Sequence, residues 1–288
     1  MAVSVREAMD RIIAGVSVLP VEEVGLLDAQ DRVLAEVVDS PIVLPPHTNS
    51  AMDGYAVRAE DVRGAAKASP RRLRIVEELP AGRRPTRPIG PGECARIFTG
   101  AALPEGSDGV IRQEDTAREG DVVVIESDRD AGRNIRLAGE DLKRGDRVFE
   151  AGTSLGAAQL GVLASMAKSR VQVHRRARVA ILASGDEIVD LDETDAILSG
   201  ARIASSNSYT LHALVRDAGA IPVMLGIAKD TLASMREHIE RGIREADIIV
   251  STGGVSVGEH DFVKGALEAL GATMDFWRVS MRPGSPLG

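Results

Sequence analysis

The sequence contains little cysteine, few aromatic residues and no long apolar run. Its single cysteine, Cys94, excludes an intrachain disulfide and a thiolate cage for a metal within one chain, and it fits a reducing compartment. Seven aromatic residues among 288 argue against stacking platforms for single-stranded nucleic acid. Because no apolar run approaches the roughly 20 residues that span a bilayer, we expect a soluble globular protein without a membrane segment.

The sequence also has fewer basic than acidic residues. The 35 Lys and Arg residues are outnumbered by 43 Asp and Glu residues, which gives a net charge of −8. A field of that sign repels polyanions, so we expect no general binding of nucleic acid or of an anionic membrane. The N-terminus reaches charge at Arg6 and Glu7 and lacks the apolar core of a signal peptide. These features predict a cytoplasmic protein.

The N-terminal part of the chain is predicted to contain helices around an all-β lobe. A capping box, Ser4-x-x-Glu7, and the helical spacing of the apolar residues behind it predict a helix over residues 5–17. Residues 43–137 contain short β-rich runs separated by Gly/Pro-rich turns, which indicates an all-β lobe. These runs are residues 73–76, 94–98, 109–112 and 122–125. Helical spacing returns over residues 154–167.

From residue 178 onward, apolar strands and helices alternate. The strands are predicted at residues 179–183, 223–227, 248–250 and 274–279, and the helices at residues 207–218, 231–246 and 262–270. Such a pattern indicates a mostly parallel sheet with helices on both faces, which is a three-layer α/β domain. The arginine-rich residues 169–178 are predicted to form a linker. The fold class is therefore α/β multidomain, with regions 1–170 and 171–288.

Carboxylates follow three of the predicted parallel strands. Glu187 follows the first strand, Asp230 the second and Asp261 the third. Ligands of such sheets bind beyond the carboxyl ends of the strands. Three acids at one edge suit Mg²⁺, which takes one or two protein carboxylates together with waters and phosphate oxygens. Taken singly, Asp230 and Asp261 are also good helix N-caps, and the pattern leaves that alternative open.

The loop after the third strand suits an anion. Gly253, Gly254 and Gly258 let backbone N–H groups approach a ligand, and the N-terminus of the next helix favours negative charge. Ser251 and Ser256 lie in the same loop and are candidate binding residues. The loop is neither a Walker A motif nor G-x-G-x-x-G, so a dinucleotide is not indicated.

A second candidate anion site lies near the end of the sequence. Arg278 and Arg282 flank a Pro-Gly turn that also contains Ser285. Guanidinium groups beside a tight turn suit an oxyanion. Two arginines near a chain end are usually solvated surface, and that alternative stays open.

Residues 45–57 have an unusual composition. Two prolines precede small polar residues, and Asn49, Asp53 and Gly54 can hold a tight backbone geometry that presents side-chain oxygens outward. Taken alone, the segment is equally consistent with a surface turn before a strand.

These motifs, in this order, resemble those of the MoeA family, the molybdopterin molybdenumtransferases, whose relatives include the E domain of gephyrin. The motifs are Asn49-Ser50-Ala51-Met52-Asp53-Gly54-Tyr55-Ala56, Phe98-Thr99-Gly100-Ala101, Asn134-Ile135-Arg136, Gly139-Glu140-Asp141, Ser184-Gly185-Asp186-Glu187 and Ser251-Thr252-Gly253-Gly254-Val255-Ser256-Val257-Gly258.

The resemblance implies insertion of molybdate into the dithiolene of adenylated molybdopterin, with Mg²⁺-dependent release of AMP. It assigns Asp53, Thr99 and Asp141 to one half of the site. The other half would contain the acids after the three strands as Mg²⁺ ligands, the glycine loop for the pterin phosphate, and the two arginines for molybdate or phosphate. In the family the halves meet across a homodimer interface, and a molybdopterin adenylyltransferase is a candidate partner. Neither Asp53 nor Asp141 has an obvious charge partner nearby in sequence, so a bound cation would compensate their desolvation.

The sequence departs from the family pattern in two places. A turn that is commonly Lys-Pro-Gly-Lys-Pro reads Arg282-Pro283-Gly284-Ser285-Pro286, with one cation fewer. Family members also continue into further helices and a C-terminal β domain, so we expect an incomplete α/β domain with uncovered apolar surface and reduced activity or solubility. Two alternatives remain open: a non-catalytic scaffold of the same fold, and another phosphate-ester or nucleotide-binding enzyme that uses the strand-end acids.

Overall fold

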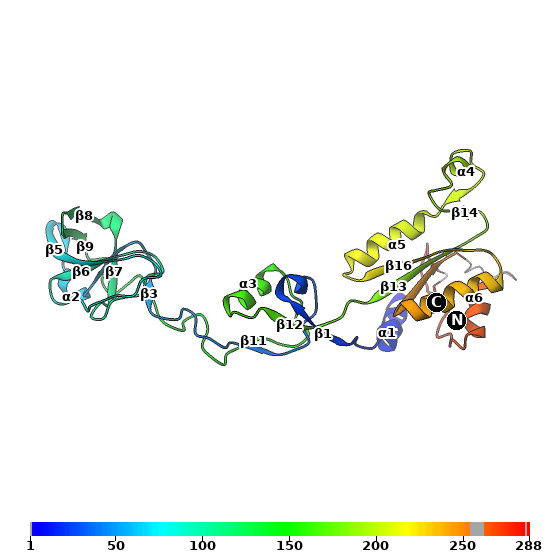
Figure 1. Cartoon of the computed structure of the whole chain (residues 1–288), viewed down its shortest axis with the longest axis horizontal. Coiled ribbons are helices and arrows are strands. Elements are labelled where there is room, and N and C mark those ends of the chain that lie inside the picture. The colour runs from blue at the N-terminus through cyan, green and yellow to red at the C-terminus, as the bar shows by residue number, and fades with distance from the viewer. Residues whose placement is uncertain (1, 254–261, 286) are drawn as a thin grey trace. The chain divides into compact units, whose positions relative to one another are not determined.

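The computed structural model describes residues 2–253, 262–285 and 287–288 (Figure 1). The chain divides into two compact units: Val37–Glu150, called the β lobe below, and Met1–Glu36 together with Ala151–Gly288, called the α/β unit. Helices long and apolar enough to cross a membrane are absent from the described residues.

The β lobe is built on a six-stranded sheet. In spatial order its strands are β7 (Gly109–Arg112), β4 (Gly54–Val57), β6 (Glu93–Ile97), β5 (Ala66–Leu79), β9 (Val122–Ser127) and β8 (Thr116–Glu119). Neighbouring strands are antiparallel except for β5 and β6, which are parallel. All four strand runs predicted between residues 73 and 125 lie in this sheet or differ from its strands by one residue at an end, which confirms the all-β lobe.

Shorter elements connect and flank this sheet. They are β2 (Val38–Asp39), β3 (Asn49–Ser50), α2 (Ala59–Val62), the 3₁₀ turn Gln113–Asp115, β10 (Ile135–Arg136) and β11 (Arg147–Phe149). Strand β3 pairs antiparallel with β10, and β2 pairs antiparallel with β11. Because side chains alternate along a strand, Tyr55 and Val57 of β4 enter one hydrophobic core and Ala56 enters the core on the opposite face.

The described part of the α/β unit contains three parallel strands, with helices packed against them. The strands are β16 (Ile221–Ala228), β13 (Arg178–Ser184) and β17 (Ile248–Thr252), in that spatial order, and the helices are α5 (Ser206–Asp217), α6 (Leu232–Glu245) and α7 (Phe262–Ala269). Val179 and Ile181 of β13 pack with α5, whereas Ala180 and Leu182 pack with α6 and α7. Figure 1 shows α5 and α6 on opposite sides of these strands, which confirms the three-layer arrangement.

The α/β unit also contains elements outside this three-stranded sheet. They are α1 (Val5–Gly15), β1 (Val21–Gly25), the 3₁₀ turn Leu26–Ala29, α3 (Ala157–Ser165), β12 (Arg170–His174), β14 (Ile188–Val189), α4 (Thr194–Leu198) and β15 (Ile203–Ala204). The hydroxyl of Ser4 accepts a hydrogen bond from the backbone N–H of Glu7 at 3.1 Å, as the capping pattern at the start of α1 predicts.

The strand predicted at residues 274–279 is wrong. Val279 makes a single bridge, to Val3, and the backbone N–H of Val3 donates to the carbonyl of Arg278 at 2.9 Å. Phe276 and Val279 pack with Val3 and with Ala8 of α1, so these two residues contact the N-terminal segment rather than the sheet.

The linker predicted at residues 169–178 is also wrong. Strand β12 lies there and pairs antiparallel with β1 over five residues. Val171 and Val173 are buried while the residues between and beside them are not, which is the alternation of a half-buried strand. The arginines obscured that pattern because they point away from the core, where Arg170 pairs with Glu23 of β1.

Candidate functional site

Asp53 and Thr99 form a hydrogen-bonded pair at one end of the β lobe sheet. Asp53 precedes β4 and Thr99 follows β6, and the antiparallel register pairs Gly54 with Ile97. The backbone N–H and the hydroxyl of Thr99 both donate to Asp53 Oδ1 at 2.8 Å. These two hydrogen bonds, with a smaller contribution from the positive charge of Arg96, hold the pKa of Asp53 below its ordinary value. Asp53 is therefore an exposed carboxylate that stays ionised at neutral pH.

The backbone before Asp53 is held by buried polar groups. Ser50 is 1% exposed; its hydroxyl donates to the carbonyl of Met52 at 2.6 Å and accepts from the N–H of Met52 at 3.2 Å. The N–H of Ala51 donates to the carbonyl of Asn134 at 2.9 Å. A plain surface turn would leave these groups to water, so the structure does not support that alternative for this segment.

Asp141 is bound by an arginine of the same lobe. Arg136 of β10 donates to Asp141 and, through Nε, to Glu140 Oε1 at 2.7 Å. The expectation that Asp141 has no charge partner nearby in sequence is therefore wrong, because the partner lies five residues earlier. The contacts of the described residues do not join Asp141 directly to Asp53 or Thr99.

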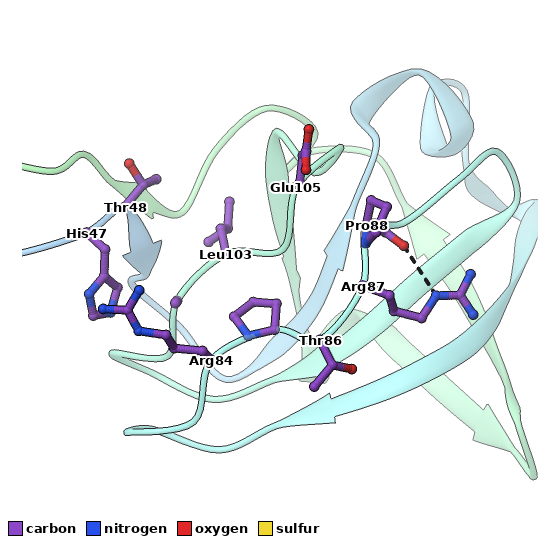
Figure 2. A pocket seen from close by; sticks show the side chains of 10 residues that line it. His47, Thr48, Arg84, Thr86, Arg87, Pro88, Leu103 and Glu105 are labelled. Carbon is purple, nitrogen blue, oxygen red and sulfur yellow. Dashed lines mark hydrogen bonds between the residues drawn. The ribbon is translucent and has the colours of Figure 1, made fainter.

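The β lobe also contains a pocket of about 450 Å³ (Figure 2). It is lined by His47, Thr48, Arg84, Pro85, Thr86, Arg87, Pro88, Ala102, Leu103 and Glu105. Its arginine-rich loop is anchored, since the hydroxyl of Thr86 donates to Glu77 at 2.9 Å and Arg87 donates to Glu93 at 2.8 Å. The sequence analysis missed this pocket, although the run of arginines between prolines was a visible signal.

In the α/β unit, two acids meet at the carboxyl ends of β13 and β16. The backbone N–H of Asp186 donates to Asp230 Oδ2, and the backbone N–H of Asp230 donates to Asp186 Oδ1, each at 3.3 Å. Both side chains are exposed. Asp186 was not assigned to the site from sequence, although it lies in a quoted motif, because only the folded loops show that it faces Asp230.

Glu187, which was assigned to the site, is oriented differently. A Cβ at Gly185 would lie 2.8 Å from Glu187 Oε2, so the Glu187 side chain folds over this glycine. Gly185 and Asp186 also line a pocket of about 670 Å³ that Arg202 and Lys229 share. Cationic groups beside strand-end carboxylates suit a ligand that carries both a phosphate and a metal ion.

The structure decides the N-cap alternative for Asp230. The N-cap of α6 is Thr231, whose hydroxyl accepts from the N–H of Ser234 at 3.2 Å. The Asp230 carboxylate therefore does not cap α6, and it lies at the carboxyl ends of the strands. Asp261, the other proposed cap, lies outside the described residues.

The beginning of the glycine loop packs against the end of β13. Ser251 lies in β17, and Gly253 follows it with φ of +88°. A Cβ at Gly253 would lie 2.7 Å from the carbonyl oxygen of Ser184, so only glycine fits this approach. The rest of the assigned loop, Gly254, Ser256 and Gly258, lies outside the described residues.

The strand-end acids suit Mg²⁺ only in part. Within the described residues, clusters of three or more His, Cys, Asp or Glu side chains able to hold a metal are absent. Asp186 and Asp230 nevertheless supply exposed carboxylate oxygens at one edge, and Mg²⁺ uses one or two carboxylates with waters. The residues present therefore fit a Mg²⁺ ion that is completed by its ligand.

The second candidate anion site is not assembled in the described residues. Arg278 lines a pocket of about 660 Å³ together with Glu7, Arg11 and Trp277. The carbonyl of Ser285 accepts from the N–H of Val279 at 2.9 Å. The contacts of the described residues do not join Arg278, Arg282 or Ser285 to the strand-end acids, and their assignment stays a prediction.

Comparison with known proteins establishes the family. Residues 3–167 match the family described as MoeA N-terminal region (domain I and II), and residues 180–288 match the probable molybdopterin binding domain. This chain belongs to the MoeA family. It is 44% identical to a molybdopterin molybdenumtransferase of Nostoc sp., over 92% of this chain and 60% of that protein, and 36% identical to one of Haemophilus influenzae, over 92% and 64%.

Solved structures agree with this family. The crystal structure of the molybdopterin biosynthesis moeA protein from Pyrococcus horikoshii covers 99% of this chain with 30% identity and a TM-score of 0.83, and 71% of that chain is matched. The chain thus spans about 60% of the length of the first of these curated relatives and 64% of the second.

Proposed function

We propose that this chain carries the reaction centre of a molybdopterin molybdenumtransferase, which inserts molybdate into adenylated molybdopterin and releases AMP in a Mg²⁺-dependent reaction. The observation that carries the proposal is the Asp53–Thr99 pair. It is an exposed, ionised carboxylate held by two hydrogen bonds within family motifs. The curated relatives bear the name molybdopterin molybdenumtransferase, which supports the same reaction.

The strand-end acids would bind the phosphate end of the substrate through Mg²⁺. We assign Glu187, Asp230 and Asp261 as ligands and add Asp186, because its carboxylate contacts the backbone of Asp230. Mg²⁺ would neutralise charge on the phosphate oxygens and the leaving AMP. Lys229, which lines the adjoining pocket, would add a cation for the same phosphates.

The remaining assigned residues would bind the rest of the substrate. The loop of Gly253, Gly254 and Gly258 would receive the pterin phosphate, with Ser251 and Ser256 as hydroxyl donors. The molybdate or phosphate seat is assigned to Arg278, Arg282 and Ser285. Asp53, Thr99 and Asp141 would approach the reacting end of the substrate.

We further propose a homodimer, in the cytoplasm, with a molybdopterin adenylyltransferase as the partner that supplies the substrate. The apolar side of α1 supports a subunit interface, since Met9, Ile12, Ile13 and Val16 are between 50% and 67% exposed. Exposed apolar stripes of this kind are typical of interaction surfaces. The reduced, buried Cys94 agrees with the compartment.

Calorimetry with adenylated molybdopterin, Mg²⁺ and molybdate tests the proposed function. We expect heat of binding that depends on Mg²⁺. No heat in any combination would favour a scaffold protein of the same fold. Binding and turnover of other phosphate esters, unaffected by Asp53→Asn, would favour the second alternative.

A further inference from the structure

Arg96 lies between two of the seven aromatic side chains of the protein. Arg96 and Phe98 share one face of β6 and its continuation, and the antiparallel register places Tyr55 of β4 opposite Arg96. The guanidinium carbon lies 4.7 Å from the centre of the Phe98 ring and 5.1 Å from that of Tyr55. Each contact is a cation–π interaction, and together they hold the guanidinium from both strands.

Two hydrogen bonds fix the same guanidinium group. Its Nη1 donates to the carbonyl of Gly54 at 2.9 Å, and its Nη2 donates to Gln113 Oε1 at 2.6 Å. The backbone N–H of Gln113 in turn donates to the carbonyl of Asp53 at 3.0 Å. A planar group with several donors suits this arrangement, and lysine could not reproduce it.

The contacts of Arg96 are adjacent in sequence to the two residues of the pair. Gly54 and Tyr55 directly follow Asp53, and Phe98 directly precedes Thr99. Arg96 is half-buried and does not itself bond to the Asp53 carboxylate among the described contacts. Apart from the small effect of its charge on the Asp53 pKa, it acts on the pair through the backbone on either side of it.

We propose that Arg96 is a positioning residue that locks the ends of β4 and β6 together, so that the Asp53 carboxylate stays within hydrogen-bond distance of Thr99. The effect of this positioning on catalysis rests on the proposed function, but the positioning itself does not. Productive sites tolerate only about 0.5 Å of displacement. Loss of the Arg96 contacts is therefore expected to move the Asp53 carboxylate out of its productive position.

A purely structural role for Arg96 makes a different prediction. In that case its replacement lowers the stability of the β lobe and leaves the Asp53–Thr99 hydrogen bonds unchanged in the folded protein. The Thr99 amide distinguishes the two roles, because its N–H donates directly to Asp53 and its resonance follows the ionisation of that carboxylate.

The test is a pH titration of the Thr99 amide by NMR in the full chain. Asp53→Asn identifies the resonance by abolishing its titration. We expect Arg96→Lys to move the midpoint upward, toward that of an ordinary aspartate, and to reduce the amplitude. Arg72→Lys is the matched control, because Arg72 is an exposed arginine of β5 that pairs with Glu119 at 2.6 Å, and it leaves the curve unchanged.

A folded Arg96→Lys protein with the wild-type Thr99 curve would overturn the proposal. If that variant does not fold, Gln113→Ala removes one anchor and serves in its place, with the same expected direction of change and the same contrary result. In a molybdenum insertion assay, Arg96→Lys is expected to lower kcat by about tenfold to a hundredfold with little change in KM. An inactive wild type would count against the proposed function and leave the NMR result standing.

Discussion

The β lobe and the α/β unit hold their candidate site residues in contrasting ways. In the lobe, the Asp53 carboxylate accepts two hydrogen bonds of 2.8 Å from Thr99. In the α/β unit, Asp186 and Asp230 are exposed, and the carboxylate of each accepts from the backbone N–H of the other at 3.3 Å. The lobe thus orients a carboxylate before any ligand arrives, whereas the α/β unit leaves carboxylate oxygens free to bind a cation.

The contrast indicates a division of roles. A carboxylate whose position is fixed by short hydrogen bonds is suited to direct contact with a reacting group, because little reorganisation is needed. Exposed acids on loops after parallel strands suit Mg²⁺, which brings its own waters and phosphate oxygens. Changes in the lobe should therefore alter geometry and rate, and changes at the strand ends should alter metal affinity.

The largest expected loss of stability comes from filling the space between β4 and β7. A Cβ at Gly54 would lie 2.0 Å from the carbonyl oxygen of Ile111, so Gly54→Ala forces two backbones apart. We expect a loss of about 3 kcal/mol or more in the free energy of unfolding, measured in urea. Amide exchange should accelerate in the lobe strands and stay unchanged in β13.

Gly161→Ala is the control for this change. Gly161 lies in α3, and a Cβ there meets nothing within 4 Å. Alanine in a helix is expected to raise stability by up to about 1 kcal/mol. A Gly54→Ala protein as stable as the wild type would show that the lobe is not held by this close approach.

Removing a strand-end acid should affect the metal. We expect Asp230→Asn to weaken Mg²⁺ binding, measured by calorimetry in the presence of substrate, by about tenfold or more. Asp217→Asn is the control, because Asp217 is exposed at the end of α5, just before β16 begins. Equal Mg²⁺ affinity in wild type and Asp230→Asn would show that the metal does not bind at this edge of the sheet.

A smaller effect concerns stability in acid. Asp247 accepts from Arg175 at 2.5 and 2.7 Å and from the N–H of Arg178 at 2.8 Å, and these bonds lower its pKa from 3.8 to about 2. A lowered pKa gives stability that is present above pH 3.8 and is lost as pH falls toward 2. Asp247→Asn should cost roughly 1–2 kcal/mol at pH 7 and flatten the acid slope.

Chemical denaturation at a series of pH values checks this prediction. It also sharpens the comparison between the two carboxylates. Asp247 accepts from Arg175 and a backbone N–H away from the strand-end acids, whereas Asp53 accepts from Thr99. If the free energy of unfolding of Asp247→Asn falls with pH as steeply as that of the wild type, the loss of stability in acid comes from other carboxylates.

Much of the fold could be predicted from local pattern. The apolar runs of β13, β16 and β17, and the spacing in α5 and α6, are strong signals because each element buries a whole face. Strand β12 was missed because Arg170 and the arginines that follow the strand outweigh its two buried valines. Residues 274–279 look like a strand, but Phe276 and Val279 pack against Val3 instead. Local pattern says which residues are apolar but not which surface covers them.

The candidate site could be predicted only in part, and its role stays a prediction. Asp230 followed from its place after a predicted strand, and the family resemblance added Thr99 to the Asp53 segment. Asp186 and Arg96 were missed because their roles depend on partners about 40 residues away, Asp230 and Tyr55, which only the folded loops and the sheet register bring together.

Molybdenum insertion by Asp53→Asn, compared with the wild type, tests the central claim most directly. The substitution keeps the size of the side chain and removes its charge, so the account predicts a folded protein in which the insertion rate falls about a hundredfold or more. Asp217→Asn, measured alongside, should keep the wild-type rate. Insertion at a near wild-type rate by folded Asp53→Asn would contradict the assignment of the Asp53–Thr99 pair to the reaction centre.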